Sequence, residues 1–401
     1  MSWRWVPPVY SPLGWGALWR GFRAMTSRRA YAECRAQIDD WMRRTYDPAA
    51  WVWTDSGTTA LTLALKLAAL ETGSRRVALP AYGCFDLATA CDGAESEVVL
   101  YDLDPTTLGP DWASLDRALA AGARTIVAVH LYGVPVDMGR LRELARANDA
   151  VLVEDAAQAA GATLGGQPCG SLGELSVLSF GRGKGMTSGS GGALLAYGER
   201  WRGEHHRLDD RQGPGGAGAV ALLKSALQCF LARPSLYRLP AALPFLGLGE
   251  TIYHPPRPAH AMTRSAAGVL AGTVRLAGAE LERRRAHAAR LLQIAAGAEQ
   301  IAVVEAAPNS VPGWLRLPLV TQGGRGASSR TDSAACLGVM PGYPAVLGTL
   351  PGFGARVVNR EDRFPGAATL VERLITLPTH GMLAEGDFER LEGWLRHDAT
   401  T

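Results

Sequence analysis

Short apolar runs alternate with amphipathic helical stretches from residue 55 to residue 198 of this 401-residue chain. The runs of strand length are 75–81, 96–104, 124–133, 150–157, 174–180 and 191–197. Helical periodicity occupies 58–70, 112–122 and 138–149. Strands that alternate with helices predict a mainly parallel sheet with helices on both faces. In such α/β domains, ligand sites gather at the carboxyl ends of the strands.

The pattern changes after Gly198. Residues 199–218 are polar and rich in glycine, and 219–250 are apolar but interrupted by prolines. These prolines exclude a membrane-spanning helix, which leaves a packed insertion, or a segment that associates peripherally with a membrane or contacts another subunit. A long helix is predicted over 265–296. We expect an N-terminal arm (1–25), a large domain (26–255, with the insertion at about 199–260) and a small C-terminal domain (256–401).

Composition narrows the function classes. The net charge of +3 is small and evenly spread, so nucleic-acid binding is not expected. Six cysteines are scattered without a CxxC pair, which predicts neither a metal site nor a disulfide framework and fits a reducing cytoplasm. The N-terminus is rich in tryptophan and proline but lacks the apolar core of a signal peptide. A cytoplasmic protein is the expectation.

Lysine is rare in this chain. Of 41 basic residues only Lys66, Lys184 and Lys224 are lysine, and Lys184 lies in the glycine-rich stretch 178–196. The stretch is not a nucleotide-binding P-loop, because Leu178 and Gly185 occupy positions that require glycine and Ser/Thr. An amine that can lose its proton can act as a nucleophile, which arginine cannot. Lys184 is therefore the candidate reactive group.

Two other strand ends carry polar residues. Ser56, Gly57 and Thr58 stand where a helix begins, so they form either an anion seat or a simple N-cap. Asp155 ends an apolar strand, and Gln158 follows it. A buried carboxylate needs a positive partner, although it could instead cap the next helix.

The three strand ends are more informative together than singly. Pyridoxal 5′-phosphate requires phosphate ligands, an acid at its ring nitrogen and a lysine that forms a Schiff base. The first strand end supplies the phosphate seat, Asp155 the acid, and the third strand end supplies Ser179 and Lys184. The combination predicts a pyridoxal phosphate site.

The motifs also resemble a known family, the DegT/DnrJ/EryC1/StrS sugar aminotransferases. The resemblance rests on SGTTAL (56–61), PAY (80–82), YDLDP (101–105), VHLYGVPVDM (129–138), VEDAAQAAGA (153–162) and GSLGELSVLSFGRGK (170–184). It implies the aspartate aminotransferase-like fold (fold type I). That fold has a large domain, with a mainly parallel seven-stranded sheet between helices, and a smaller C-terminal α/β domain.

The resemblance also implies roles for individual residues. Lys184 would form the Schiff base, Asp155 would pair with the pyridinium nitrogen, and Gln158 would lie near the phenolic oxygen. The phosphate would be held by Ser56, Gly57, Thr58 and Ser179. Where the family places an aromatic residue over the ring this chain has Cys84, so either Cys84 itself or, after a shift of one residue, the adjacent Phe85 would lie over the ring.

The activity implied is transfer of an amino group from an amino acid, with glutamate expected, to a nucleotide-linked keto sugar in polysaccharide or glycoconjugate biosynthesis. A homodimer with shared active sites is implied as well. The chain departs from the family in having no asparagine between residues 201 and 300, where the partner subunit would supply one to the phosphate. Two alternatives stay open: an aldolase or decarboxylase that uses the same lysine, and a non-catalytic assembly component.

Overall fold

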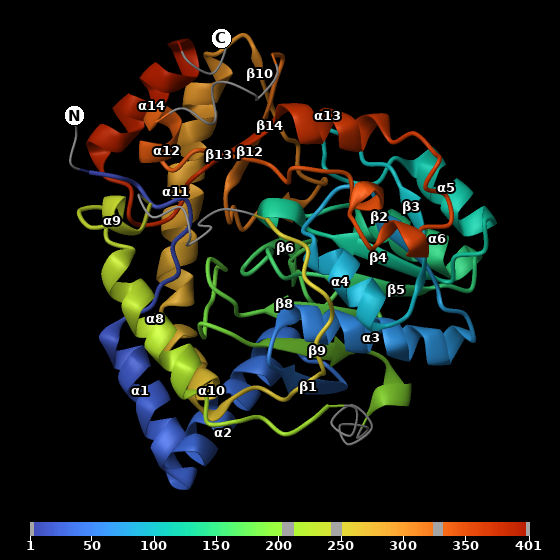
Figure 1. Ribbon diagram of the computed structural model, residues 1–401, viewed down its shortest axis with the longest axis horizontal. Coiled ribbons are helices and arrows are strands. Elements are labelled where there is room, and N and C mark those ends of the chain that lie inside the picture. The colour runs from blue at the N-terminus through green and yellow to red at the C-terminus, as the bar shows by residue number, and fades with distance from the viewer. Residues whose placement is uncertain (1–3, 203–211, 242–250, 324–331, 398–401) are drawn as a thin grey trace.

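The computed structural model describes residues 4–202, 212–241, 251–323 and 332–397. Its centre is a seven-stranded sheet in the order β1-β9-β8-β5-β4-β2-β3 (Figure 1). Five neighbouring strands are parallel, and β9 runs antiparallel to β8 and β1. The strands are β1 (Ala50–Thr54), β2 (Arg76–Pro80), β3 (Glu97–Tyr101), β4 (Thr125–Val129), β5 (Val151–Asp155), β8 (Leu175–Ser179) and β9 (Gly192–Ala196). The predicted mainly parallel sheet is confirmed.

Helices cover both faces of this sheet. Strand residues alternate between two separate cores, because successive side chains of a strand point to opposite faces. One face packs against α3 (Gly57–Thr72) and α4 (Asp86–Gly93). The other packs against α2 (Arg28–Tyr46), α5 (Trp112–Ala120), α6 (Met138–Ala147) and α10 (Arg264–Thr273). Burial on both faces explains why the strands read as continuous apolar runs.

A second, smaller unit follows in the chain. Its antiparallel sheet has the order β10-β12-β14-β13, and a third core joins it to α11 and α14. Its elements are α11 (Ala277–Ala296), β10 (Ile301–Val303), β12 (Leu317–Thr321), α12 (Asp332–Cys336), β13 (Met340–Pro341), α13 (Pro365–Arg373), β14 (Leu374–Leu377) and α14 (Glu385–His397). A three-stranded sheet of β11 (Ser310–Val311), β6 (Thr163–Leu164) and β7 (Gln167–Pro168) links it to the large sheet's domain.

The N-terminal segment packs on the body of the same chain. Its helix α1 (Trp15–Thr26) lies against α10, where an added Cβ at Gly268 or Gly272 would come within 2.8 Å of α1 backbone atoms. Both glycines are thus needed for this close helix contact. The single helix predicted over 265–296 is wrong, because the chain breaks between α10 and α11. The break follows Thr273, whose hydroxyl donates to the Thr187 carbonyl.

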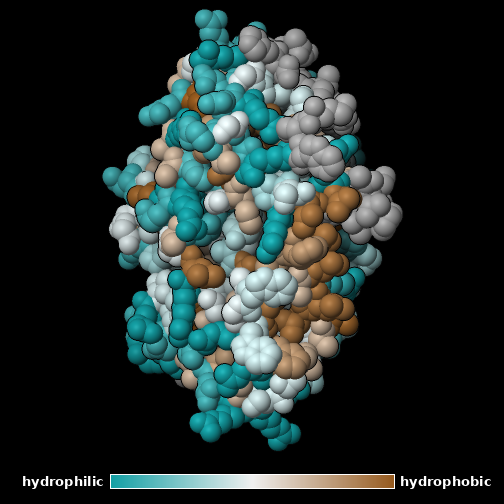
Figure 2. Space-filling view, turned by 90° about the vertical axis from the view of Figure 1, so that its left-hand side faces the viewer, coloured by the Kyte–Doolittle hydropathy of each residue, from teal (hydrophilic) through white to brown (hydrophobic). Residues whose placement is uncertain are grey.

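The insertion contributes an apolar surface. Helix α8 (Ala219–Leu231) packs one face on α1 and leaves the opposite face exposed (Figure 2). That exposed face consists of Val220, Leu223, Leu227 and Phe230. Among the helices in the described ranges, none combines the length and apolar character that crossing a membrane requires. Residues 203–211 and 242–250 of the insertion lie outside the described residues. The described ranges also contain short helices: η1 (Leu131–Gly133), η2 (Glu199–Trp201), α9 (Arg238–Ala241), η5 (Leu347–Thr349) and η6 (Gly354–Arg356).

Candidate functional site

The three strand ends singled out in the sequence meet at one cavity of about 510 Å³. It lies at the carboxyl ends of β5 and β8, beside the N-terminus of α3. Its walls include Ser56, Gly57, Thr58, Asp155, Gln158, Ser179 and Lys184. The structure therefore brings together all the predicted site residues except Phe85.

The first wall is the start of α3. The Ser56 hydroxyl accepts from the Thr59 N–H at 3.0 Å, so this side chain serves as the N-cap. The N–H groups of Gly57 and Thr58 belong to the first turn, where a helix has no internal acceptor for them. A Cβ at Gly57 would lie 2.7 Å from the Ser179 Cβ, so only glycine allows this approach. Unsatisfied amides beside the Ser179 hydroxyl suit an anion.

The second wall is the end of β5. Asp155 is buried, 8% exposed, and its Oδ1 accepts from the Ala157 N–H at 2.9 Å. Burial raises the pKa of this carboxyl, and the nearby Lys184 opposes the rise. A carboxylate with little internal compensation is prepared for a positive group in the cavity.

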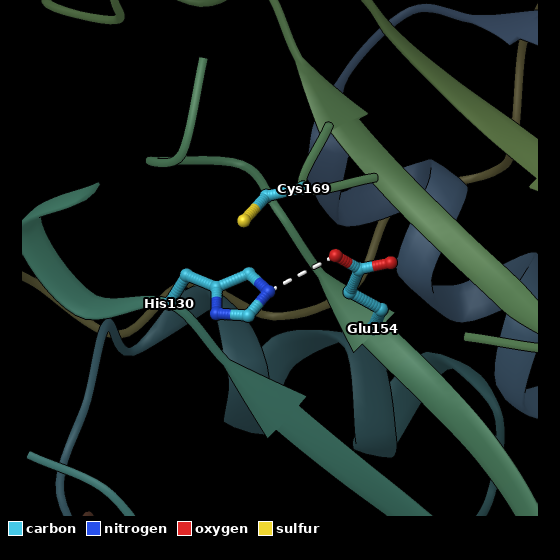
Figure 3. Close-up of side chains that lie close together, drawn as sticks. All are labelled: His130, Glu154 and Cys169. Carbon is cyan, nitrogen blue, oxygen red and sulfur yellow. Dashed lines mark hydrogen bonds and ion pairs between the residues drawn. The ribbon is translucent and has the colours of Figure 1, made fainter. Parts of the chain in front are cut away.

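The preceding residue, Glu154, points to the opposite face and meets His130 and Cys169 (Figure 3). The imidazole Nδ1 accepts from the Val136 N–H at 3.1 Å, so Nε2 carries the proton and donates to Glu154 at 3.0 Å. Four further donors reach the carboxylate: the N–H groups of Gly170, Leu172 and Gly173 and the Ser176 hydroxyl. Burial raises the pKa of Glu154, but these bonds outweigh it and the pKa is lowered.

The donor set has a metal-like composition, but the hydrogen bonds already occupy the carboxylate and both imidazole nitrogens. This cluster is a structural anchor that fixes the end of β5. The sequence did not show the cluster, because its members are 15 or more residues apart and meet only in the folded sheet.

The third wall is the loop after β8, which carries Lys184. The loop is fixed from two sides. The Gly183 N–H donates to the Ser11 hydroxyl at 2.9 Å, and the Thr273 hydroxyl donates to the Thr187 carbonyl at 2.6 Å. Lys184 is half-buried, whereas Lys66 and Lys224 are exposed on helices away from the cavity. Of the three lysines, Lys184 alone reaches this site.

Gln158 and the loop after β2 complete the cavity. The Gln158 amide accepts from the Tyr132 N–H at 3.0 Å and donates to the Tyr343 hydroxyl at 2.9 Å, so it connects two segments that are far apart in the sequence. Cys84 lines the cavity, while Phe85 packs into the apolar core behind it. The placement of Phe85 differs from the prediction because Phe85 immediately precedes α4 and its ring faces the core that this helix covers. Burial raises the pKa of the Cys84 thiol to about 12.

A second cavity of about 550 Å³ adjoins the first and shares Gln158, Arg182 and Lys184 with it. Its other lining residues include Tyr132, Arg316 and Tyr343, none of which was predicted from the sequence. The tyrosine rings stack with centroids 5.8 Å apart. The sequence held one signal for Arg316. This residue interrupts the apolar run that leads into β12, and an arginine is rarely buried in such a run unless it has a partner.

The architecture is that of fold-type-I pyridoxal phosphate enzymes: a seven-stranded, mainly parallel sheet, a small C-terminal unit and a strand-end cavity. Residues 46–208 match the model of the DegT/DnrJ/EryC1/StrS aminotransferase family, which confirms the predicted resemblance over that part of the chain. A protein from Streptococcus pneumoniae, solved in a PLP form and a PMP form, superposes with a TM-score of 0.77 in both. The superposition covers 98% of each chain at 17% identity, and it shows the common fold.

Two named relatives each match a part of the chain. The L-glutamine:2-deoxy-scyllo-inosose aminotransferase of Streptoalloteichus tenebrarius is 36% identical over 158 residues, which cover 39% of this chain and 37% of that protein. The GDP-perosamine synthase of Caulobacter vibrioides is 37% identical over 140 residues, or 35% and 38% of the two chains. The chain thus aligns with less than two-fifths of the length of these relatives.

Proposed function

We propose that the protein is a pyridoxal phosphate-dependent aminotransferase that moves an amino group from glutamate or glutamine to a nucleotide-linked keto sugar. The observation that carries the proposal is the convergence of Lys184, Asp155 and the first amides of α3 on one cavity. The names of the relatives, which mention glutamine, an inosose and a GDP-linked sugar, support an amino donor and a sugar acceptor. Polysaccharide or glycoconjugate biosynthesis is the proposed setting.

The residues present fit the cofactor. Gly57 and Thr58 offer amides and Ser179 a hydroxyl, which suit a phosphate, and the missing Cβ of Gly57 keeps these groups close. Asp155 would hold the ring nitrogen, and Gln158 would lie near the phenolic oxygen. Lys184 would hold the cofactor covalently. When bound, pyridoxal phosphate withdraws electrons from the substrate carbon that loses or gains a proton.

The chain's own groups then have separate tasks. The buried Asp155 carboxylate would keep a proton on the ring nitrogen, since a negative charge in a cavity of low polarity favours a positive neighbour. The Lys184 amine would move a proton between the substrate α-carbon and the C4′ carbon of the cofactor. Both tasks need side chains that are fixed in position. The Ser11 and Thr273 hydrogen bonds hold the loop that carries Lys184, and the Glu154 cluster holds the end of β5 next to Asp155.

The assembly is also part of the proposal. We infer a cytoplasmic homodimer with shared active sites, as the family resemblance implies. The exposed apolar face of α8 leaves peripheral membrane association through 219–250 as a further possibility. Light scattering of the purified protein tests the first, and a vesicle sedimentation assay tests the second.

Transfer assays separate the proposal from its alternatives. The holoprotein is incubated with isotopically labelled glutamate or glutamine and either an inosose or a nucleotide-linked keto sugar. The proposal predicts a labelled amino sugar and one equivalent of the keto acid. Carbon dioxide release would indicate a decarboxylase, and carbon–carbon cleavage would indicate an aldolase. Failure to retain pyridoxal phosphate would favour a non-catalytic assembly component.

A further inference from the structure

The second cavity contains a buried guanidinium whose partners do not match its charge. Arg316 is 5% exposed. Its Nε donates to the Thr376 hydroxyl at 2.7 Å, and its Nη2 donates to the carbonyls of Thr376 and Gly338 at 2.7 and 2.8 Å. Its Nη1 is buried and has no hydrogen-bond partner within the described residues. All these partners are neutral, so the positive charge is held in place but not balanced.

A second buried arginine, Arg284, has the counter-ion that a buried charge usually needs. Arg284 is 3% exposed at its side chain and forms an ion pair with the equally buried Glu280, at 3.4 Å. Across ranges 4–202, 212–241, 251–323 and 332–397, no carboxylate plays this part for Arg316. Burial lowers the pKa of Arg316 to about 10, and only Tyr132 and Tyr237 oppose the change. A buried charge without a counter-ion is costly unless a ligand supplies one.

The position of Arg316 indicates the ligand. It lines the same cavity as Lys184, the group that would react with the substrate, and Tyr132 and Tyr343 line that cavity too. An anion that binds Arg316 in this cavity would therefore belong to the reacting molecule. The described cations of this cavity are Arg316, the exposed Arg182 and Lys184. Arg316 is the buried one of the three, and a single planar guanidinium matches the single charge and the two oxygens of a carboxylate.

We propose that Nη1 of Arg316 binds a carboxylate of the amino donor and so orients the donor amine toward Lys184. The inference rests on the proposed function, and it assigns Arg316 as a substrate-binding residue that selects carboxylate-bearing donors. A charge-assisted hydrogen bond to a planar guanidinium supplies both affinity and direction. The Thr376 and Gly338 contacts would keep the guanidinium from turning away.

The first test is binding without turnover. Glutarate, a dicarboxylate that has no amine, is titrated into the holoprotein and its dissociation constant is measured by calorimetry. We expect Arg316→Gln to weaken glutarate binding about 10- to 100-fold, because a hydrogen bond to a charged group is lost. Arg285→Gln is the matched control: Arg285 also donates to backbone carbonyls, at Gly161 and Pro312, but lines neither cavity. It should bind glutarate like the wild type.

A second variant keeps the proposal testable if Arg316→Gln does not fold. Arg316→Lys keeps the charge but lacks the planar fork, so we expect glutarate binding to weaken about tenfold. Unchanged glutarate affinity in Arg316→Lys, or in a folded Arg316→Gln, overturns the proposal. So does weakened binding of a nucleoside diphosphate with glutarate affinity retained, because Arg316 would then bind the phosphate of the sugar substrate.

The third test is donor selection. The first half-reaction is followed by absorption with glutamate and with a simple alkylamine of similar length. Arg316→Gln should lower kcat/KM for glutamate about 10- to 100-fold and leave the alkylamine rate within about twofold. An equal loss for both amines overturns the proposal. Glutarate binding does not need transfer to a sugar, so a failed transfer assay with Arg316-dependent glutarate binding would contradict the proposed function alone.

Discussion

Glu154 and Asp155 are adjacent carboxylates at the end of one strand, yet their surroundings differ completely. Glu154 accepts from a protonated imidazole nitrogen, three backbone N–H groups and a hydroxyl, and it is fully buried. Asp155 accepts one backbone N–H and faces the cavity that holds Lys184. The strand pleat alone sends the two side chains to opposite faces.

The comparison separates a structural acid from a functional one. A buried carboxylate whose hydrogen bonds all come from the chain stabilises the fold and leaves no position for a ligand. A buried carboxylate with few internal partners is costly in the free protein and keeps its capacity for a positive ligand. The opposite pKa shifts of the two groups express this difference.

The largest effect is expected in the cavity that Asp155 faces, at Lys184. Lys184→Ala should lower the transfer rate by about 10³-fold or more, because the group that moves the proton is removed. Lys66→Ala and Lys224→Ala are the matched controls, since both lysines are exposed on helices outside the cavity. Steady-state transfer assays measure the change, and a Lys184→Ala rate within tenfold of the wild type would contradict the assignment.

Asp155→Asn should lower the transfer rate by about 10²- to 10³-fold, because a charge that stabilises the ring nitrogen is lost. The same substitution should increase the stability of the cofactor-free protein. The pKa of Asp155 is raised on folding, so its contribution to stability is present below the ordinary aspartate pKa and is lost as pH rises through the raised value. The variant should therefore unfold at higher denaturant concentration than the wild type at pH 7, and a lower midpoint would contradict this.

Glu154→Gln should act on stability. We expect the free energy of unfolding at pH 7 to fall by about 2–4 kcal/mol, since an amide cannot accept from all of these donors. The pKa of Glu154 is lowered on folding, so its stabilisation is present above the ordinary glutamate pKa and is lost as pH falls through the lowered value. Denaturation curves should show the gap between variant and wild type narrowing in acid; a constant gap would mean that charge is not the cause.

The smallest effect is expected at Cys84. Its pKa of about 12 keeps the thiol neutral at pH 7, so it offers the cofactor only dispersion contacts. Cys84→Ala should change the dissociation constant of pyridoxal phosphate by about fivefold or less. Equilibrium titration by absorption measures it. A much larger change would show that the thiol does more than line the cavity.

The sequence was sufficient for the features that depend on local pattern. Apolar runs of strand length located six of the seven strands of the large sheet, all except β1, and the scarcity of lysine directed attention to Lys184. The helix break after Thr273 was missed. Residues 265–296 have helical periodicity throughout, so local pattern could not reveal it.

The features that depend on tertiary contacts could not be predicted. His130, Glu154 and Cys169 come from three separate segments and meet only when β4 and β5 pair. Arg316 comes from the small unit, and its unbalanced charge is evident only when its neighbours are known. Phe85 was a candidate for the cavity wall because it is adjacent to Cys84. It lies one residue further along, immediately before α4, and its side chain packs into the core instead.

The central claim is that Lys184 holds pyridoxal phosphate in the cavity beside Asp155. The most direct test is to load the protein with the cofactor, reduce it with borohydride and identify the modified residue by peptide mass spectrometry. The claim predicts the reduced cofactor on Lys184 in the wild type, and no stoichiometric modification in Lys184→Ala. Modification of Lys66 or Lys224 instead, or of no lysine, would contradict it.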